Sequence, residues 1–170
     1  MASPADLNLI CNYGAGQTQT DITGAGIDYI TADNCTNTSS NRTSNPLTIP
    51  TDATNAYSYE KWLAFQLGTT EPDTQVTNFK FWGGGGAIDS GNVKDYYKTT
   101  NTYVTPALST TNGGYTAVTA ATAGAKASVT GTLNTSGETS SFLVMMLEVN
   151  SLASQGNMVQ QTYNYSYDEN

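Results

Sequence analysis

The chain contains no histidine, and lysine and arginine together supply only six of its 170 residues. Without histidine no side chain has an ordinary pKa near neutrality, which excludes Ser-His-Asp and Cys-His catalytic sites and histidine-bound metals. The formal net charge is −8, and the basic residues are scattered: Arg42, Lys61, Lys80, Lys94, Lys98 and Lys126. Because phosphate groups are bound mainly through lysine and arginine, we expect neither nucleic acid nor an anionic membrane as a partner.

Charge of either sign is scarce, since charged residues make up 12% of the chain, against about 25% in an average soluble protein. Threonine, serine, asparagine and glycine supply the polarity instead, and eleven residues are tyrosine. β-Branched and aromatic residues favour strands, while glycine, asparagine and serine favour turns. The composition therefore predicts an all-β protein of short strands and loops.

Long hydrophobic runs are also missing. The longest, Phe142–Leu147, is the length of a strand, whereas a membrane helix needs about 20 apolar residues. The opening sequence MASPADLNL has neither the basic start nor the apolar stretch of a secretory signal. We expect a chain that is made in the cytoplasm and does not enter a membrane.

Only two cysteines are present, Cys11 and Cys35. They could form one disulfide that closes a long N-terminal loop, or remain free and buried. In a cytosolic chain the free, buried state is the expected one. Two cysteines without histidine do not make a zinc site.

Residues 1–54 are loop-rich and polar, with short strand candidates at Leu7–Tyr13 and Ile27–Thr31 followed by the stretch ADNCTNTSSNRTSNP. Pro46 and Pro50 bracket a segment that we expect to be extended. This part of the sequence predicts an extended polar N-terminal arm, with the main domain at residues 55–170.

The main domain begins with NAYSYEKWLAFQL, Asn55–Leu67, whose spacing predicts a short helix capped by Ser58. The next segment, VTNFKFW at Val76–Trp82, alternates as a strand does and places Phe79 and Phe81 on one face, toward a core.

Several more strands follow, separated by turn signals. Phe142–Leu147 is apolar on both faces and is therefore expected to be a central strand, covered on each side. The last strand carries a row of tyrosines on one face and polar residues on the other, which predicts a half-exposed strand. The strands are predicted at Lys94–Lys98, Thr102–Pro106, Ala127–Leu133, Phe142–Val149 and Val159–Tyr167. Short strands with at most one helix predict a β-sandwich, for which jelly-roll and immunoglobulin-like arrangements are both compatible.

Paired carboxylates are the remaining route to catalysis, because glycoside hydrolysis needs an acid and a base about 5–10 Å apart. The candidates by residue type are Glu60, Glu71, Glu138 and Glu148. A carboxylate at a strand end explains each of them without catalysis, so we expect a protein that is not an enzyme and has no cofactor.

Two loop features could bind ligands. Asp89, Asn92 and Asp95 are candidate metal ligands at three-residue spacing, but they do not match the EF-hand pattern, and Asp and Asn are ordinary turn residues, so no metal site is expected. Gly83–Gly86 follow Trp82 directly, yet neither a Walker lysine nor an apolar helix comes after them. We therefore expect Gly83, Gly84, Gly85 and Gly86 to form a turn or bulge at a sheet end rather than a phosphate loop.

Over residues 55–170 the order of short motifs resembles that of small β-rich virion structural proteins from tailed phages and prophages. The motifs are SYEKWL at Ser58–Leu63, NFKFW at Asn78–Trp82, TTNTYVTP at Thr99–Pro106, FLVMMLEV at Phe142–Val149 and YSYDE at Tyr165–Glu169.

The resemblance implies a capsid decoration or cement protein that sits on the outside of the virion, binds the major capsid protein and forms a homotrimer. Tyrosine and tryptophan are common interface anchors, so the candidate contact residues are Trp62, Trp82, Tyr96, Tyr97 and Tyr103. The alternative is a carbohydrate-binding, adhesion or filament-forming β-sandwich module at a tail tip or cell surface.

Overall fold

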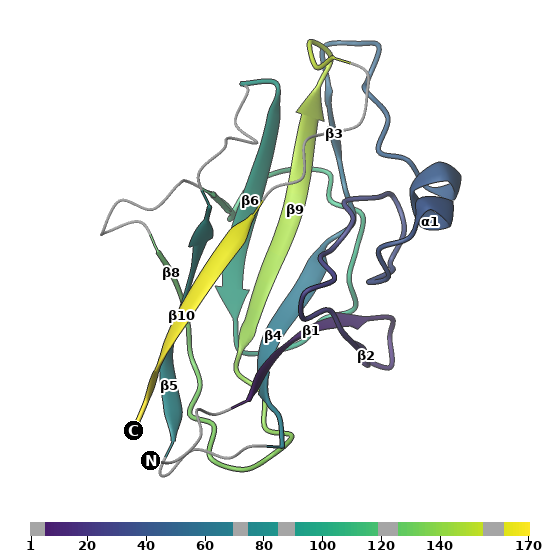
Figure 1. Cartoon of the computed structure of the whole chain (residues 1–170). Helices are drawn as coiled ribbons and strands as arrows, with labels where there is room; N and C mark the ends of the chain where they lie inside the picture. The colour runs from purple at the N-terminus through teal and green to yellow at the C-terminus, as the bar shows by residue number, and fades with distance from the viewer. Residues whose placement is uncertain (1–5, 70–74, 85–90, 119–125, 155–161) are drawn as a thin grey trace.

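A computed structural model of the chain describes residues 6–69, 75–84, 91–118, 126–154 and 162–170, which form two antiparallel β-sheets packed on each other (Figure 1). The large sheet has the strand order β2-β1-β4-β9-β6-β7, with β3 also paired to β9, and the small sheet has the order β10-β5-β8. The strands are β1 Leu7–Tyr13, β2 Thr18–Asp21, β3 Asn55–Tyr57, β4 Lys61–Leu67, β5 Val76–Gly83, β6 Val93–Thr100, β7 Thr116–Ala117, β8 Ala127–Val129, β9 Phe142–Asn150 and β10 Tyr163–Glu169. The predicted all-β, sandwich-like fold is confirmed.

Strand β9 is the centre of the large sheet, as its apolar run predicts. It pairs with β6 along one side. On its other side β4 pairs with the first half of β9 and β3 pairs with its last three residues. Every residue from Phe142 to Val149 is buried. Both faces of this strand are covered because the small sheet lies over one and a loop lies over the other.

Aromatic side chains fill the space between the two sheets. Phe79 stacks on Phe65 with ring centroids 5.1 Å apart, and Phe81 stacks on Tyr163 at 5.3 Å. Phe79 and Phe81 therefore point inward from β5, as expected. Tyr163 and Tyr167 of β10 also pack against this core, which confirms the tyrosine face of the last strand.

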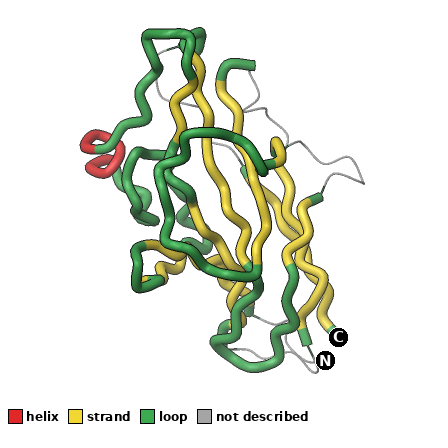
Figure 2. The backbone as a smooth tube through the Cα atoms, turned by 180° about the vertical axis from the view of Figure 1, so that it is seen from behind, coloured by secondary structure: helices red, strands yellow, loops and turns green. Residues whose placement is uncertain are grey.

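The outer face of the large sheet is covered by residues 101–115, which we call the strap. Figure 2 shows this loop crossing in front of the sheet. Tyr103 and Tyr115 of the strap pack on a cluster of Trp62, Ala64, Phe142 and Val144. The strand predicted at Thr102–Pro106 is wrong, because the chain leaves the sheet after β6 and runs across it.

The helix predicted at Asn55–Leu67 is also wrong, since this segment contains β3 and β4. In β4, Leu63 and Phe65 face the small sheet while Trp62 faces the strap, and all of them are buried. A strand covered on both faces does not alternate between apolar and polar residues, so its sequence can resemble that of a short helix. The helix in the described residues is instead α1, Ser39–Ser44, capped by the Thr38 hydroxyl.

Residues from the region predicted as an N-terminal arm complete the large sheet. Leu7–Tyr13 is strand β1, as predicted, and pairs with β4 from Leu7↔Leu67 to Asn12↔Trp62. Ile27–Thr31 is not a strand, although Ile30 is buried. The expectation of free cysteines is wrong as well, since Cys11 and Cys35 form a buried disulfide. This bond ties β1 to the long excursion between β2 and β3.

The remaining strand predictions are met in part. Lys94–Lys98 lies within β6, and Ala127–Leu133 begins with β8 and ends with a single bridge from Leu133 to Val76. The last strand is β10, and residues 159–161 of the predicted segment lie outside the described residues. No helix among the described residues has the length and apolar character to cross a membrane.

Candidate functional site

The outer face of the small sheet is the best candidate for an interaction surface, and we call it the Trp82 face. It consists of the outward side chains of the three strands and of Lys126, which precedes β8: Thr77, Lys80, Trp82, Lys126, Ser128, Asn164, Ser166 and Asp168. Side chains alternate between the two faces of a strand, so Lys80 and Trp82 point outward because Phe79 and Phe81 point into the core.

A bulge in β5 shapes one end of this face. Asn78 has a positive φ of 55°, and the register with β10 shifts between Ser166 and Asp168. The side-chain amide of Asn78 donates a hydrogen bond of 2.8 Å to Asp168 Oδ2. The extra residue keeps both Val76 and Phe79 buried on the inner side of the strand.

Two ammonium groups lie on the Trp82 face. Lys126 Nζ stands 3.9 Å from the centroid of the Trp82 ring, a cation–π contact. Lys80 Nζ donates to Ser128 Oγ at 2.8 Å. By contrast, Arg42 and Lys98 are paired with Asp28 and Glu60. The Trp82 face therefore brings together an aromatic ring and two surface cations in a protein of net charge −8.

The glycines after Trp82 have a packing role that the structure explains at Gly84. Its N–H donates to the Thr162 carbonyl oxygen at 2.7 Å. A Cβ at this position would lie 2.8 Å from the same oxygen, closer than side chains tolerate. Gly84 thus lets β5 and β10 approach at the end of the small sheet. Gly83 is the last residue of β5, and Gly85 and Gly86 lie outside the described residues.

Glu60 occupies a polar cluster beneath the strap. Lys98 Nζ donates to its Oε1 at 2.9 Å, the Tyr115 hydroxyl donates to the same oxygen, and Trp62 Nε1 donates to Oε2 at 3.0 Å. Burial acts to raise the pKa of Glu60, but the hydrogen bonds from Tyr115, Lys98 and Trp62 outweigh burial and hold that pKa below its ordinary value. Oε1 thus ties Tyr115 of the strap to the sheet, while Oε2 is held by Trp62 of β4.

Glu148 has a similar position on β9. The side-chain amide of Asn112, from the strap, donates to Glu148 Oε2 at 2.9 Å and to the Tyr96 hydroxyl at 3.2 Å. Of the other two carboxylate candidates, Glu138 is exposed and accepts hydrogen bonds from the backbone of Asn134 and Thr135, and Glu71 lies outside the described residues. Glu60 and Glu148 act as anchors for the strap.

Asp95 lies between the two sheets rather than in a metal-binding loop. The Tyr163 hydroxyl donates to its Oδ2 at 2.8 Å, and the Tyr29 hydroxyl lies 3.1 Å from that of Tyr163. Burial raises the pKa of both tyrosines above the ordinary value. Asn92 accepts a hydrogen bond from Asn150, and Asp89 lies outside the described residues. The described residues hold no cluster of three or more carboxylate or cysteine ligands.

Lys61 is a buried cation that the sequence alone did not reveal. Its ammonium donates to the backbone oxygens of Ala32 at 3.3 Å and Asn34 at 2.6 Å. Burial lowers its pKa to about 8, while the nearby carboxylates of Asp33 and Asp28 act in the opposite direction. Lys61 therefore fastens the excursion to β4 next to the disulfide.

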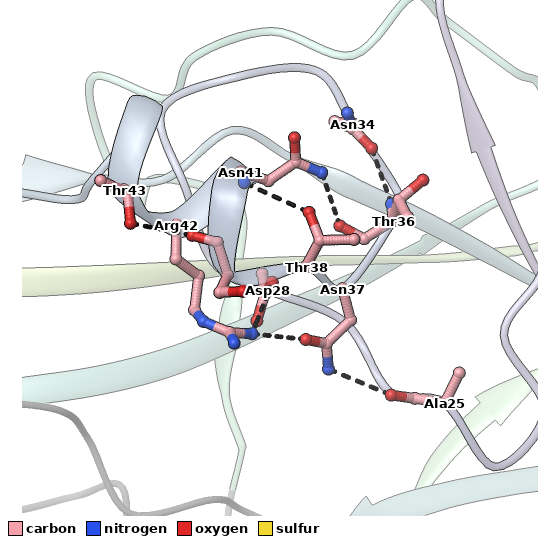
Figure 3. A network of polar contacts seen from close by, with 10 residues as sticks. Ala25, Asp28, Asn34, Thr36, Asn37, Thr38, Asn41, Arg42 and Thr43 are labelled. Atoms are coloured by element: carbon pink, nitrogen blue, oxygen red, sulfur yellow. Dashed lines mark hydrogen bonds and ion pairs between the residues drawn. The ribbon is translucent and has the colours of Figure 1, made fainter.

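The exposed part of that excursion is ordered by side-chain amides and hydroxyls (Figure 3). Arg42 of α1 forms an ion pair with Asp28 at 3.1 Å and also donates to Asn37 Oδ1. Asn37 Nδ2 donates to the Ala25 carbonyl oxygen at 3.0 Å, and Asn41 Nδ2 donates to that of Thr36 at 2.8 Å. These contacts explain how a segment so rich in Asn, Thr and Ser holds a defined path.

The predicted contact residues do not form one surface. Trp62 is only 3% exposed and packs on Tyr103 at a ring distance of 5.3 Å, so it belongs to the strap cluster. Tyr103 donates its hydroxyl proton to the Gly14 carbonyl oxygen, and Tyr97 packs against the core between the sheets. Only Trp82 lies on the surface described above.

Sequence reasoning missed Lys80 and Lys126 as partners of Trp82. Lys80 could have been found, because it lies two residues before Trp82 on an alternating strand. Lys126 could not, since it lies 44 residues later in the sequence, directly before β8, and the pairing of β8 with β5 brings it there. Comparisons with protein-family models, curated protein sequences and solved structures gave no match to this chain.

Proposed function

We propose that the protein is a non-enzymatic virion structural protein that binds the outside of a phage or related viral capsid and stabilises it. The observation that carries the proposal is the Trp82 face, a mostly uncharged surface with an aromatic residue and two lysines. Aromatic residues supply much of the binding energy at protein interfaces, while flanking polar residues complete the contact.

The motifs of the resemblance support this role because they build the framework of both sheets. SYEKWL leads into β4, NFKFW lies in β5, FLVMMLEV forms most of β9 and YSYDE ends β10. The fifth motif, TTNTYVTP, runs from the end of β6 into the strap. Similarity that lies mainly in framework strands fits a shared scaffold better than a shared active site. The partner would be the major capsid protein, and the chain would assemble in the host cytoplasm as a homo-oligomer, with the trimer as the form that the resemblance implies.

The carboxylates also fit a structural role. Glu60 and Glu148 each accept hydrogen bonds from the strap, and Glu60 is neutralised by Lys98. Removing a catalytic carboxylate would abolish a reaction, whereas removing either of these would loosen the strap.

Capsid binding is tested with purified protein and expanded capsids that lack any decoration protein. We expect cosedimentation with the capsids and greater capsid resistance to heat. The double variant Trp82→Ala/Lys126→Ala should lose binding, while Lys94→Ala should keep it, because Lys94 lies on β6 in the other sheet. Failure of the unmodified protein to bind capsids would contradict the proposal.

Sugar binding is the outcome that would favour the alternative module. The Lys126 ammonium already contacts the Trp82 ring, so a sugar that stacks on that side of the ring has to displace it. Saturable binding to a defined glycan on an array, lost in Trp82→Ala, would replace capsid binding as the function of this face.

A further inference from the structure

The small sheet ends in an edge strand that is unusually long for this protein. Strand β10 has seven residues, whereas the other strands that end a sheet, β2, β7 and β8, have four, two and three. Short edge strands protect a sheet against pairing with other chains, as do lysine and proline at the edge. Strand β10 contains neither lysine nor proline, and its charged residues are the last two, Asp168 and Glu169. Its first five residues therefore have none of these protections.

The backbone groups that face this edge follow from the pairing with β5. Gly84 N–H bonds to the Thr162 oxygen, and hydrogen-bonded and non-hydrogen-bonded pairs alternate along an antiparallel ladder. Asn164 and Ser166 therefore bond to β5, while Tyr163, Tyr165 and Tyr167 direct their N–H and C=O groups to the other side. Within the part of the chain that the structure describes, no strand pairs with that side.

Tyr165 adds an apolar group at the same edge. Its ring lies 5.3 Å from that of Phe65, at the rim of the core between the sheets, yet the residue is 42% exposed. It is one of four large hydrophobic residues that are exposed in the described structure. A strand added beside β10 would extend the sheet and cover this ring.

We propose that β10 pairs antiparallel with β10 of a second copy of this chain, about a two-fold axis at Tyr165, so that two small sheets become one continuous sheet. In this register Tyr165 faces its own equivalent, and Tyr163 faces Tyr167. The inward tyrosine rows of the two copies then form one row, in which the two Tyr165 rings cover each other.

The charges of β10 favour a second copy in this orientation. Asp168 and Glu169 are its only charged residues, and both lie at one end. Antiparallel self-pairing places Asp168 opposite the uncharged Thr162 of the other copy, so the two acidic ends lie far apart. Parallel pairing would set the acidic ends side by side, where like charges destabilise a sheet.

This inference is independent of capsid binding, because the Trp82 face is a face of the small sheet and β10 pairs through its edge. A two-fold contact gives even-numbered assemblies. Combined with a trimer formed through another surface, this contact gives assemblies whose number of subunits is a multiple of six, whereas the contact alone gives a dimer.

The test is the oligomeric state of the full chain, measured by light scattering and analytical ultracentrifugation over a range of protein concentration. Tyr165→Pro removes an N–H that faces the edge and spares every hydrogen bond to β5, whereas Tyr165→Ala removes the same ring and keeps the N–H. We expect the unmodified protein and Tyr165→Ala to form even-numbered assemblies, with Tyr165→Ala associating more weakly. We expect Tyr165→Pro to lose the two-fold contact.

Amide hydrogen exchange of the unmodified protein tests the same contact without any substitution. The amides of Tyr165 and Tyr167 should be protected only at concentrations where the assembly forms, and those of Asn164 and Ser166 at every concentration. A protein that stays monomeric, a trimer alone, or an assembly that Tyr165→Pro leaves intact would overturn the proposal. So would amides of Tyr165 and Tyr167 that exchange equally fast at all concentrations.

Discussion

The Cys11–Cys35 disulfide makes the stability of this protein depend on redox conditions. Cys11 lies on β1, between β2 and β4, and Cys35 lies in the excursion that carries α1. Both side chains are buried in the core. Reduction leaves the contacts of the folded protein in place but removes a constraint from the unfolded chain, which gains conformational entropy. The disulfide therefore stabilises the protein mainly by restricting its unfolded state.

The size of the effect follows from the separation of the two cysteines, which is 24 residues. Loop-closure entropy for a loop of that length corresponds to about 3 kcal/mol at 25 °C. For a chain of this size each kcal/mol shifts the melting temperature by about 2–4 °C, so reduction should lower it by about 6–12 °C.

Urea unfolding of the oxidised protein, the reduced protein and the Cys11→Ala/Cys35→Ala variant measures this difference. The oxidised and reduced forms should differ by about 3 kcal/mol in the free energy of unfolding, and the variant should not respond to reductant. The variant should be less stable than the reduced protein, because it also loses two buried sulfur atoms. Two reactive thiols in the unreduced, unfolded protein, or equal stability of both forms, would refute the reasoning.

Four further predictions concern single side chains. The pKa of Glu60 is lowered in the folded protein, so the stability that ionised Glu60 gives the fold is fully present above the ordinary pKa of 4.5 and is lost as the pH falls through the pKa of the folded state. The fluorescence of Trp62, measured in Trp82→Phe protein, should follow this loss. Glu60→Gln should remove the pH dependence. The pKa of Lys61 is about 8 in the folded protein, against an ordinary value of 10.5, so the free energy of unfolding should rise as the pH increases from about 8 to 10.5. Urea titrations measure this rise, and Lys61→Met should abolish it. Phe79→Ala should cost about 3–5 kcal/mol in urea unfolding because it leaves a cavity against Phe65; Lys80→Ala, the neighbouring control, should cost less than about 0.5 kcal/mol. Gly84→Ala should cost about 1–3 kcal/mol in the same assay, since its Cβ would overlap Thr162, and an unchanged midpoint would show that β10 can move aside.

The sequence predicts best those strands whose own pattern reports their surroundings. Strand β9 is apolar from Phe142 to Leu147 because both of its faces are covered, and β5 alternates because only one of its faces is covered. Strand β4 is also covered on both faces, but Lys61 and Gln66 interrupt its apolar run and give it a helical spacing. The lysine is explained only by the carbonyl groups of the excursion, which come from elsewhere in the chain.

The candidate site was predictable only in part, for the same reason. The alternation of β5 predicts that Trp82 and Lys80 share a face. The contact of Lys126 with Trp82 depends on which strands pair, and the burial of Trp62 depends on a strap whose residues carry no periodic pattern. Pairing across long sequence separations is a property of the whole fold, which local patterns do not encode.

The central position of β9 also determines when the protein can finish folding. In the large sheet, as far as the structure describes the chain, strand pairing connects β2-β1-β4 to β6-β7 through β9, which begins at Phe142. During synthesis, which proceeds from the N-terminus, β4 and β6 leave the ribosome well before their common neighbour and keep open edges until it arrives. Pairing of this long range is slow and exposes edges to other chains. The hazard of misassembly on the ribosome is thus concentrated on β4 and β6, and it ends when the ninth strand is inserted between them.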